Sequence, residues 1–377
     1  MPDVLFSILL PTRNRAELLG AAISSVLRQT YHRFELIISD NDTEGTRTHD
    51  VVQEFTDPRI RYYRTDGQLA MSENWNSALE KAAGTHIIVL EDKQRLVPNT
   101  LEVLANVIAC NNAAVISYLW DRLDVGSPEQ TFALDDQAWK VERHSTKDLI
   151  KRFATDEIYV DRLFACGENS CVSRETIKKV KEQSTSGKAF NPLSPDISFG
   201  FAICACEEAF WHVAAPLVYS PDFANKDHAR YSNGFGLFQK SPETKEYFRH
   251  VGVPVQEIVA LVPVKSEWLL TNIYLFDYFK HYVSVVGSAA PEINWARYIV
   301  TCIQGVRNMR SLGGRTESED AEIARVLKER GLFFRLSVLG NLVRKISKRK
   351  LLRLFRKIRQ KRRVRLVAIG KASAGLN

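Results

Sequence analysis

Short apolar runs alternate with amphipathic stretches through the first hundred residues. Residues 4–10 (VLFSILL) are almost continuously apolar and are followed by Pro11, which predicts a buried strand. From Ala16 to Gln29 the apolar residues recur at intervals of three and four, which predicts a helix with one buried face. The same pattern predicts strands at 34–39, 59–64 and 85–90, and helices near 46–56, at 72–83 and from Pro98. Strands and helices alternating at this spacing predict an α/β fold with a doubly wound, mostly parallel sheet.

The pattern becomes less regular after residue 112. A strand is expected at 113–120, loops or a hairpin at 121–145, helices near Arg174 and Pro195, a strand near Leu217, and mostly helix over 234–332. We therefore expect four parts, which are two halves of one sheet domain, a helical extension and a tail. Their expected ranges are 1–112, 113–233, 234–335 and 336–377.

Polar residues follow directly after three of the predicted strands. In a doubly wound sheet, ligands bind outside the carboxyl ends of the parallel strands. The residues at these positions are candidates for a binding site. They are Thr12, Arg13 and Asn14 after the first strand, Asp40, Asn41 and Asp42 after the second, and Glu91, Asp92 and Lys93 after the fourth.

The formal net charge of +8 is concentrated in one segment. Residues 344–365 contain 13 Lys and Arg and no acid, which leaves the other residues with a net charge of −5. Residues 339–367 are amphipathic in pieces, and a cationic helix with Leu and Phe on one face suits the surface of an anionic membrane. A helix packed on its own domain is the alternative. Nucleic acid is disfavoured as a partner, because the tail has no aromatic interleaving and no RNA-binding motif.

Several protein classes are disfavoured by the rest of the sequence. The six cysteines lack CxxC spacing and a His cluster, so we expect reduced thiols and not a zinc site or a disulfide framework. The N-terminal residues have no basic region before the first apolar run, so we expect no signal peptide. No apolar run reaches the length that spans a bilayer, so we expect no integral membrane segment.

Four segments occur in the order and spacing typical of the family 2 glycosyltransferases. They are SILLPTRNRAELLGAAISSVLRQTYHRFELIISDND, RIRYYR, SENWNSALEKAAGTHIIVLED and RLVP. The sequence resembles this family strongly over about residues 4–105, more weakly to about residue 230, and not beyond. The resemblance implies a GT-A fold, in which a nucleotide-sugar lies across the carboxyl edge of the sheet and the sugar is transferred with inversion of configuration.

The resemblance also implies roles for single residues on the donor side. A carboxylate can accept the N–H of a uracil-like base, and the ribose hydroxyls need fixed polar partners. Pro11, Asn14 and Asn74 could instead be strand-end or helix-capping residues. The matching positions are Pro11, Thr12 and Asn14 in the loop that lines the nucleotide, Asp40 at the base or ribose, Arg61 beside the base, and Asn74 and Asn76 flanking the donor.

The metal-binding segment departs from the family pattern. The family has a run of acids after the fourth strand, which holds Mg²⁺ or Mn²⁺ beside the leaving diphosphate. Here the flanking Leu90, Leu96 and Pro98 match, but the centre reads Glu91, Asp92, Lys93, Gln94. Asp92, with Glu91 beside it, could still bind the metal. Lys93 could instead bind the diphosphate as a point charge, or the site could bind a donor without turnover.

An inverting transferase also needs a base for the acceptor hydroxyl. The segment NPLSPDISFG at 191–200 resembles the family segment that carries this carboxylate, which makes Asp196 the candidate. Its alternative role is an acid that complements a helix dipole. Glu207 and Glu208 are the fallback candidates.

These observations predict a cytoplasmic, membrane-peripheral glycosyltransferase of surface polysaccharide synthesis. It would transfer a sugar from a UDP-linked donor to a glycan or a lipid-linked acceptor. The alternative is a nucleotide-sugar-binding partner subunit without transferase activity. A nucleotidyltransferase is disfavoured, because PTRNR stands after the first strand where that class has a Gly-rich loop with Arg and Lys. The identity of the sugar, the acceptor and the linkage does not follow from these motifs.

Overall fold

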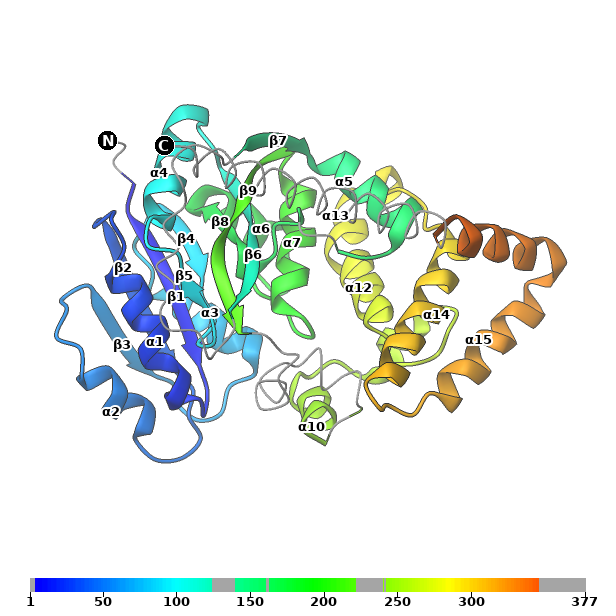
Figure 1. The fold of residues 1–377 in the computed structure, drawn as a ribbon, viewed down its shortest axis with the longest axis horizontal. Helices are drawn as coiled ribbons and strands as arrows, with labels where there is room; N and C mark the ends of the chain where they lie inside the picture. Colours follow the sequence, from blue (N-terminus) through cyan, green and yellow to red (C-terminus); the bar gives the residue numbers. More distant parts are fainter. Residues whose placement is uncertain (1–3, 124–139, 161–162, 222–239, 241, 346–377) are drawn as a thin grey trace, which may run out of the picture.

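The computed structural model describes residues 4–123, 140–160, 163–221, 240 and 242–345 of the 377-residue chain. Nine strands in these residues form one mixed sheet. Helices cover both faces of the sheet, and a group of helices from the C-terminal third lies beside it (Figure 1). This arrangement confirms the expected α/β class with a helical C-terminal extension.

The first half of the sheet is parallel and follows the predicted alternation of strands and helices. Its strand order is β3-β2-β1-β4, and each of these neighbouring pairs is parallel. The carboxyl ends of four strands therefore meet at one edge. The strands are β1 (Phe6–Thr12), β2 (Phe34–Asp40), β3 (Ile60–Arg64) and β4 (His86–Val89), and the helices are α1 (Ala16–Leu27), α2 (Arg47–Gln53), α3 (Met71–Glu80) and α4 (Thr100–Asn111).

The second half of the sheet contains reversed strands that the sequence pattern did not predict. β8 (Ser170–Ser173) lies between β4 and β6 (Val115–Leu123) and is antiparallel to both. β6 is parallel to β9 (Ala209–Pro221), whereas β5 (Arg95–Leu96) and β7 (Val141–Ser145) are antiparallel to β9. The three reversed strands have two to five residues, which is too short for a periodic pattern to distinguish a strand from a loop.

The helices after β7 divide between the sheet and the extension. Those on the sheet are α5 (Thr146–Arg152), α6 (Arg174–Gln183) and α7 (Pro195–Cys206). The extension consists of α10 (Pro242–His250), α11 (Val255–Ala260), α12 (Leu270–Tyr278), α13 (Ser284–Val286), α14 (Trp295–Ser311) and α15 (Glu317–Glu329), followed by a helix at 331–345. In the part of the chain described, no helix combines the length and the apolar character needed to cross a bilayer.

Alternate residues of the strands supply two apolar cores, one on each face of the sheet. Ile8 and Leu10 of β1 pack in the core that contains α1 and α4. Leu9 faces the opposite core, which contains α3, α6 and α7 and continues into α12 and α14. The extension therefore shares a core with the sheet and holds a fixed position against it.

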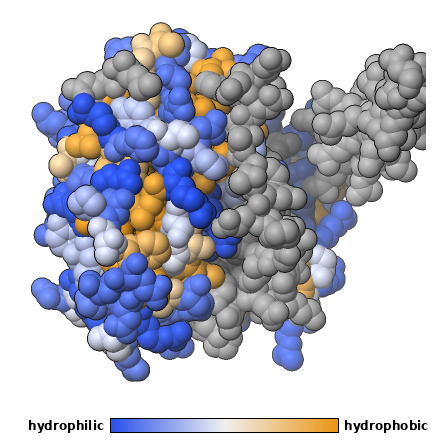
Figure 2. Space-filling view, turned by 60° about the vertical axis from the view of Figure 1, so that its left-hand side comes forward, coloured by the Kyte–Doolittle hydropathy of each residue, from blue (hydrophilic) through white to orange (hydrophobic). Residues whose placement is uncertain are grey.

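The outer side of the first half is mainly polar. Figure 2 looks at the left-hand side of the view in Figure 1 and shows hydrophilic residues over most of this side, with apolar residues gathered in a central band. This distribution agrees with a sheet whose apolar residues are used in the two cores.

Gly84, two residues before β4, lies where a side chain has no space. A Cβ atom at this position would be 2.5 Å from Ser7 Oγ and 2.6 Å from the Leu5 carbonyl oxygen. We predict that Gly84→Ala destabilises the fold by about 1–3 kcal/mol, because backbone atoms of β1 must shift. Chemical denaturation measures this loss.

Gly20→Ala in α1 is the matched control for this prediction. The nearest atom to its added Cβ is Val51 Cγ1 at an ordinary 3.7 Å, and alanine gains up to about 1 kcal/mol over glycine within a helix. If Gly84→Ala were as stable as Gly20→Ala, the close packing of residue 84 on β1 would be refuted.

Candidate nucleotide-sugar site

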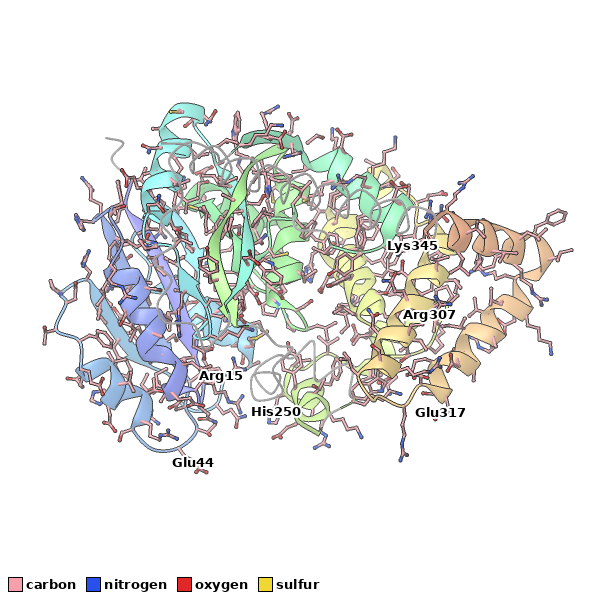
Figure 3. All side chains as sticks on the ribbon, viewed as in Figure 1. Arg15, Glu44, His250, Arg307, Glu317 and Lys345 are labelled. Carbon is pink, nitrogen blue, oxygen red and sulfur yellow. The ribbon has the colours of Figure 1, made fainter. Side chains whose placement is uncertain are left out.

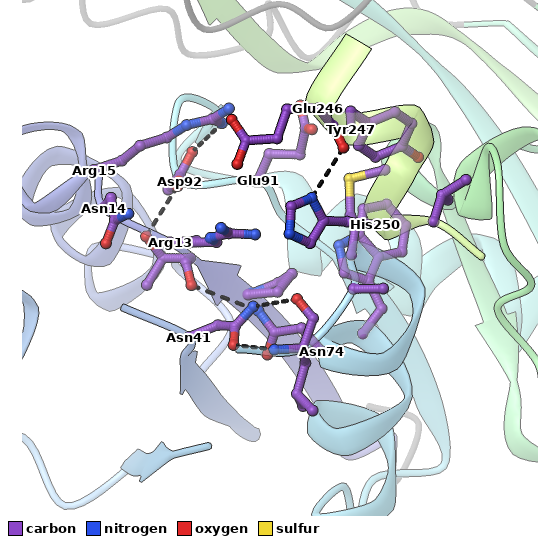
Figure 4. A pocket seen from close by; sticks show the side chains of 17 residues that line it. Arg13, Asn14, Arg15, Asn41, Asn74, Glu91, Asp92, Glu246, Tyr247 and His250 are labelled. Atoms are coloured by element: carbon purple, nitrogen blue, oxygen red, sulfur yellow. Dashed lines mark hydrogen bonds and ion pairs between the residues drawn. The ribbon is translucent and has the colours of Figure 1, made fainter. Parts of the chain in front are cut away.

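A cavity of about 320 Å³ lies at the carboxyl edge of the parallel strands. Its walls come from the loops after β1 and β4, the start of α3 and one face of α10 (Figures 3 and 4). Of the residues predicted from the sequence, Pro11, Thr12, Asn14, Asn74, Glu91 and Asp92 line it. The structure thus brings together side chains that are up to 81 positions apart in the sequence.

Asp92 connects the loop after β4 to the loop after β1. Its Oδ2 accepts a hydrogen bond from Thr12 Oγ1 at 2.9 Å, and its Oδ1 forms an ion pair with Arg15 Nη1 at 3.2 Å. The Asp92 side chain is only 3% exposed. Burial raises the pKa of the Asp92 carboxyl group, although Arg15 opposes the increase. Both carboxylate oxygens therefore contact groups of the protein.

Asn14 connects the loop after β1 to the loop after β2. Its backbone has a φ of +53°, a left-handed conformation that asparagine adopts more readily than most residues. Its N–H donates to the Asp42 carboxylate, and its side-chain Nδ2 donates to Thr43 Oγ1 at 3.2 Å. These contacts fix the loop that lines the cavity floor.

Two asparagines hold the start of α3 against β1 and β2. Asn74 Oδ1 accepts from Ser39 Oγ at 2.6 Å. Asn41 Oδ1 accepts from the Leu69 N–H, and Asn41 Nδ2 donates to the Leu69 carbonyl, both at 2.9 Å. Asn76 instead points to Phe190, and its Nδ2 donates a hydrogen bond to the Phe190 carbonyl oxygen at 2.7 Å. The amide groups of Asn41 and Asn74 are therefore both structural and part of the cavity lining.

Four of the predicted donor residues, Asp40, Arg61, Asn76 and Lys93, do not line the cavity. Asp40 is fully buried, and its carboxylate accepts from Tyr62 Oη at 2.6 Å and from the Asp42 N–H at 2.9 Å. Arg61 forms an ion pair with Glu35 Oε2 at 2.5 Å and donates to the Lys81 carbonyl. Glu35 lies near the start of β2, so Arg61 points toward the amino edge of the sheet, opposite the cavity.

Lys93 lies beside the cavity within a group of carboxylates. Its Nζ is 2.5 Å from Glu91 Oε2, and the two side chains are 11% and 12% exposed. Burial opposes the charged form, but Glu91 and Glu168 outweigh it and raise the pKa of Lys93. Burial and the adjacent Glu91 raise the pKa of Glu168 well above its ordinary value. Lys93 is therefore a cation, and it is buried against acids.

Asp196, the predicted base, lies in the first turn of α7 and is not among the residues that line the cavity. A Cβ at Gly167 would be 3.2 Å from Asp196 Cα and 2.7 Å from the Trp75 ring. The glycine therefore allows both the start of α7 and the cavity residue Trp75 to pack closely against it. Burial, followed by Glu91, raises the pKa of Asp196 to about 6. The groups that act on it electrostatically are Glu91, Lys93, Glu168, Tyr247, Tyr274 and Asp277.

The helical extension holds the turn that precedes Asp196. Leu193 has a left-handed φ of +81°, a strained conformation for a leucine. Its carbonyl accepts from Tyr247 Oη of α10 at 2.5 Å, and Ser194 Oγ donates to Asp277 of α12. The Leu193 side chain packs in an apolar cluster with residues of α10, α11 and α12. The extension therefore positions the start of α7.

Sequence reasoning did not assign roles to several residues that line the cavity. Arg13 and Arg15 stand within the PTRNR segment, so their place in a strand-end loop was the available signal. Glu246, Tyr247 and His250 of α10 reach the cavity from residues far along the chain. Figure 4 shows the side chains of Arg13 and His250 pointing toward one another, and no sequence pattern marked this approach.

The expected metal ligands do not form a metal site in this arrangement. Asp92 is bonded to Thr12 and Arg15, and Glu91 is paired with Lys93. Among the described residues, no group of three His, Cys, Asp or Glu side chains is arranged to hold an ion. Mg²⁺ and Mn²⁺ bind through carboxylate and other oxygens, and here the nearest carboxylates are neutralised by cations of the chain.

Comparisons with known proteins find sequence similarity in the first half of the chain. The sequence model of "Glycosyl transferase family 2" matches residues 7–181. The chain is 33% identical over 125 residues to the Escherichia coli UDP-Glc:alpha-D-GlcNAc-diphosphoundecaprenol beta-1,3-glucosyltransferase WfgD, covering 33% of this chain and 48% of WfgD. It is 34% identical over 101 residues to the Campylobacter jejuni GalNAc(5)-diNAcBac-PP-undecaprenol beta-1,3-glucosyltransferase, covering 26% of this chain and 32% of that protein. The chain thus spans less than half the length of these relatives.

Solved structures resemble the chain over most of its length but only loosely. Staphylococcus aureus TarS 1-349 in complex with UDP-GlcNAc has 14% identity and a TM-score of 0.46, with 90% of this chain and 89% of TarS covered. The mannosyltransferase PcManGT from Pyrobaculum calidifontis, in complex with GDP-Man and Mn²⁺, has 11% identity and a TM-score of 0.44, with 92% and 87% covered. Similarity at this level carries no residue-by-residue argument.

Removing the Tyr247 hydroxyl group should loosen the turn before Asp196. Tyr247→Phe leaves the Leu193 carbonyl without its donor, which we predict costs about 1–3 kcal/mol of stability. We also predict faster amide hydrogen exchange at the start of α7, because the strained Leu193 loses a restraint.

Tyr31→Phe is the matched control, since Tyr31 Oη donates to the Val4 carbonyl at 2.7 Å in a different part of the molecule. It should lower stability without changing exchange at 193–200. Equal exchange at 193–200 in Tyr247→Phe and the wild type would contradict the role of the extension.

Proposed function

Residues 7–181 match the sequence model of glycosyl transferase family 2, and on this premise we propose that the chain transfers a sugar from a nucleotide-sugar to a glycan or lipid-linked acceptor. The observation that carries the proposal is the polar cavity at the carboxyl edge of the parallel strands. Asp196 is linked to the cavity residue Trp75 through Gly167, which packs closely against both. This edge is where ligands bind in doubly wound sheets.

The cavity lining suits a nucleoside diphosphate. The side chains of Thr12, Asn14, Asn41 and Asn74 offer hydroxyl and amide groups for a base and a ribose. Arg13 and Arg15 add guanidinium groups, which bind phosphate oxygens in pairs. UDP is the proposed nucleotide because the name of WfgD specifies UDP-Glc as its donor.

We assign the acceptor chemistry to Asp196. Its carboxylate takes the proton of the acceptor hydroxyl group while the acceptor oxygen attacks the anomeric carbon of the donor sugar. The bond from that carbon to the diphosphate breaks, and its electron pair leaves on the phosphate oxygen. Attack opposite the leaving group inverts the configuration. The raised pKa of about 6 makes Asp196 a stronger base than an exposed aspartate while it stays ionised at neutral pH.

We further propose that the protein works peripherally at the cytoplasmic face of the plasma membrane. The two relatives have names that specify undecaprenol-linked diphosphate acceptors. In the helix at 331–345, Leu332, Leu336, Leu339 and Val343 recur at intervals of four and three and are 54–65% exposed. This exposed apolar stripe suits the interface of a bilayer. The expected membrane segment 339–367 extends from this helix, and its residues 346–367 lie outside the described part.

Basic residues stand at the end of this helix. Arg344 and Lys345 line a second cavity of about 300 Å³ together with Arg152 and Arg297, and Asp156 is the acid in its lining. Cationic side chains next to an apolar stripe favour a surface of anionic lipids. In Figure 3, Lys345 lies at the end of the helix that is nearer to the sheet domain.

Asp196→Asn should greatly slow sugar transfer without weakening the binding of the donor nucleotide. We expect binding of UDP, measured by calorimetry, to stay within about threefold of the wild type, whereas the rate of transfer falls by about 10²- to 10⁴-fold. The wild-type kcat/KM should rise with pH through about 6 and fall about tenfold per pH unit below it, because only the deprotonated carboxylate accepts the proton.

If Asp196 titrated as an ordinary exposed aspartate, kcat/KM would stay constant between pH 5 and 7. A flat pH profile over this range would therefore contradict the assignment of Asp196 as the base. Glu208→Gln in the same half of the protein is the control and should retain the wild-type rate. Binding of UDP-sugars without transfer to any acceptor would favour the partner-subunit alternative, and no binding of any nucleoside diphosphate would refute the proposed function.

Charges placed on the exposed stripe should prevent membrane binding. We predict that Leu336→Glu with Leu339→Glu lowers binding to vesicles of phosphatidylcholine and phosphatidylglycerol by at least about tenfold, because apolar contact is lost and like charges are added. Both side chains are more than half exposed, so the fold should be retained.

Val285→Glu is the matched control, since Val285 is an exposed apolar residue of α13 outside the stripe. It should bind vesicles as the wild type does. A double variant that binds vesicles as well as this control would remove the membrane proposal.

A further inference from the structure

We propose that the chain stabilises the leaving diphosphate with its own cations, Lys93 and Arg15, in place of a divalent metal. The proposal rests on the proposed function and specifies how its site works. It concerns the segment after β4 where the sequence predicts a metal.

The carboxylates expected to hold the metal are engaged by protein groups. Asp92 has one oxygen on Thr12 and the other on Arg15, and it is almost completely buried. A metal at Asp92 would have to displace the Arg15 guanidinium or share the carboxylate with it. Because like charges repel strongly at a site shielded from water, the ion pair and the metal exclude one another.

The Lys93 ammonium group already lies among the carboxylates of Glu91 and Glu168. Glu91 is 2.5 Å away, and Glu168 is a further carboxylate that interacts with the Lys93 charge. A divalent ion at this position would lie next to a buried ammonium group, with the nearest carboxylate already paired. Lys93 thus supplies one positive charge where the family pattern supplies a metal ion.

The two cations can reach a diphosphate in the cavity. Arg15 and Glu91 line the cavity directly, and Lys93 contacts Glu91. The ammonium group is therefore one side chain away from the cavity, and a diphosphate oxygen can replace or join Glu91 as its partner. Lysine acts there as a point charge, whereas the Arg15 guanidinium can donate two parallel hydrogen bonds.

The charges balance during the proposed transfer step. The bond between the anomeric carbon and the diphosphate oxygen breaks, and the electron pair stays on that oxygen as the new bond to the acceptor oxygen forms. The acceptor proton moves to Asp196. The added negative charge on the diphosphate develops toward Lys93 and Arg15, and stabilisation of a developing charge by prearranged cations lowers the barrier.

The test is UDP binding by calorimetry in excess EDTA and in excess MnCl₂. For the wild type we expect the two dissociation constants to agree within about threefold. Lys93→Met should weaken binding in EDTA by at least about tenfold because a charge-assisted contact is lost. Lys93→Asp, which restores an acidic run, should bind UDP weakly in EDTA and regain affinity with Mn²⁺.

Two further variants keep the result interpretable. Lys93→Arg retains the charge and should stay closer to the wild type than Lys93→Met. Lys179→Met removes a lysine that pairs with Glu207 at 3.0 Å, away from the cavity, and should bind UDP as the wild type does. Thermal unfolding of each variant checks that the fold is retained.

The outcomes distinguish this inference from the function on which it rests. Wild-type binding that requires Mn²⁺ would overturn the inference and leave the glycosyltransferase proposal in place. Lys93→Met with unchanged affinity in EDTA would also overturn it. No binding of UDP, GDP, CDP, ADP or dTDP in either buffer would refute the proposed function itself.

Discussion

The buried carboxylate of Asp92 holds together two loops at the carboxyl edge of the sheet, because it pairs with Arg15 and accepts a hydrogen bond from Thr12. A second ion pair, Lys93–Glu91, lies within the loop after β4. Breaking a buried pair by removing one partner typically costs about 3–5 kcal/mol, because the other charge is left without compensation. The loop after β1 and the loop after β4 are therefore fixed relative to one another before any ligand arrives. A prearranged set of charges of this kind does not have to reorganise as a reaction proceeds.

The helical extension completes this arrangement from the other side. It shares the apolar core on one face of the sheet, and through Tyr247 and Asp277 it holds the turn that leads into α7. The same α10 that contacts this turn also lines the cavity. The position of Asp196 thus depends on residues more than fifty positions later in the chain, and one helix links the cavity to the start of α7.

The sequence predicted the parts of the site that depend on strand ends, and it failed where side-chain direction decides. Thr12 ends β1, and Asn14 and Asp92 follow β1 and β4, so the shared edge of these parallel strands brings the three residues together. Asp40 occupies an equivalent position, but the hydroxyl of Tyr62 on the neighbouring strand turns it inward. Arg61 turns toward Glu35 at the opposite edge. Tyr247 and His250 reach the cavity through tertiary packing, which leaves no local pattern.

The central claim is that a nucleoside diphosphate binds in the cavity between the strand-end loops and α10. Hydrogen exchange measured by mass spectrometry, with and without UDP, tests it most directly. The account predicts that UDP slows exchange together in the loop after β1, at the start of α3, in residues 91–94 and in α10, which all border the cavity or its ion pairs. Protection confined to other segments, or no protection at saturating UDP, would contradict it.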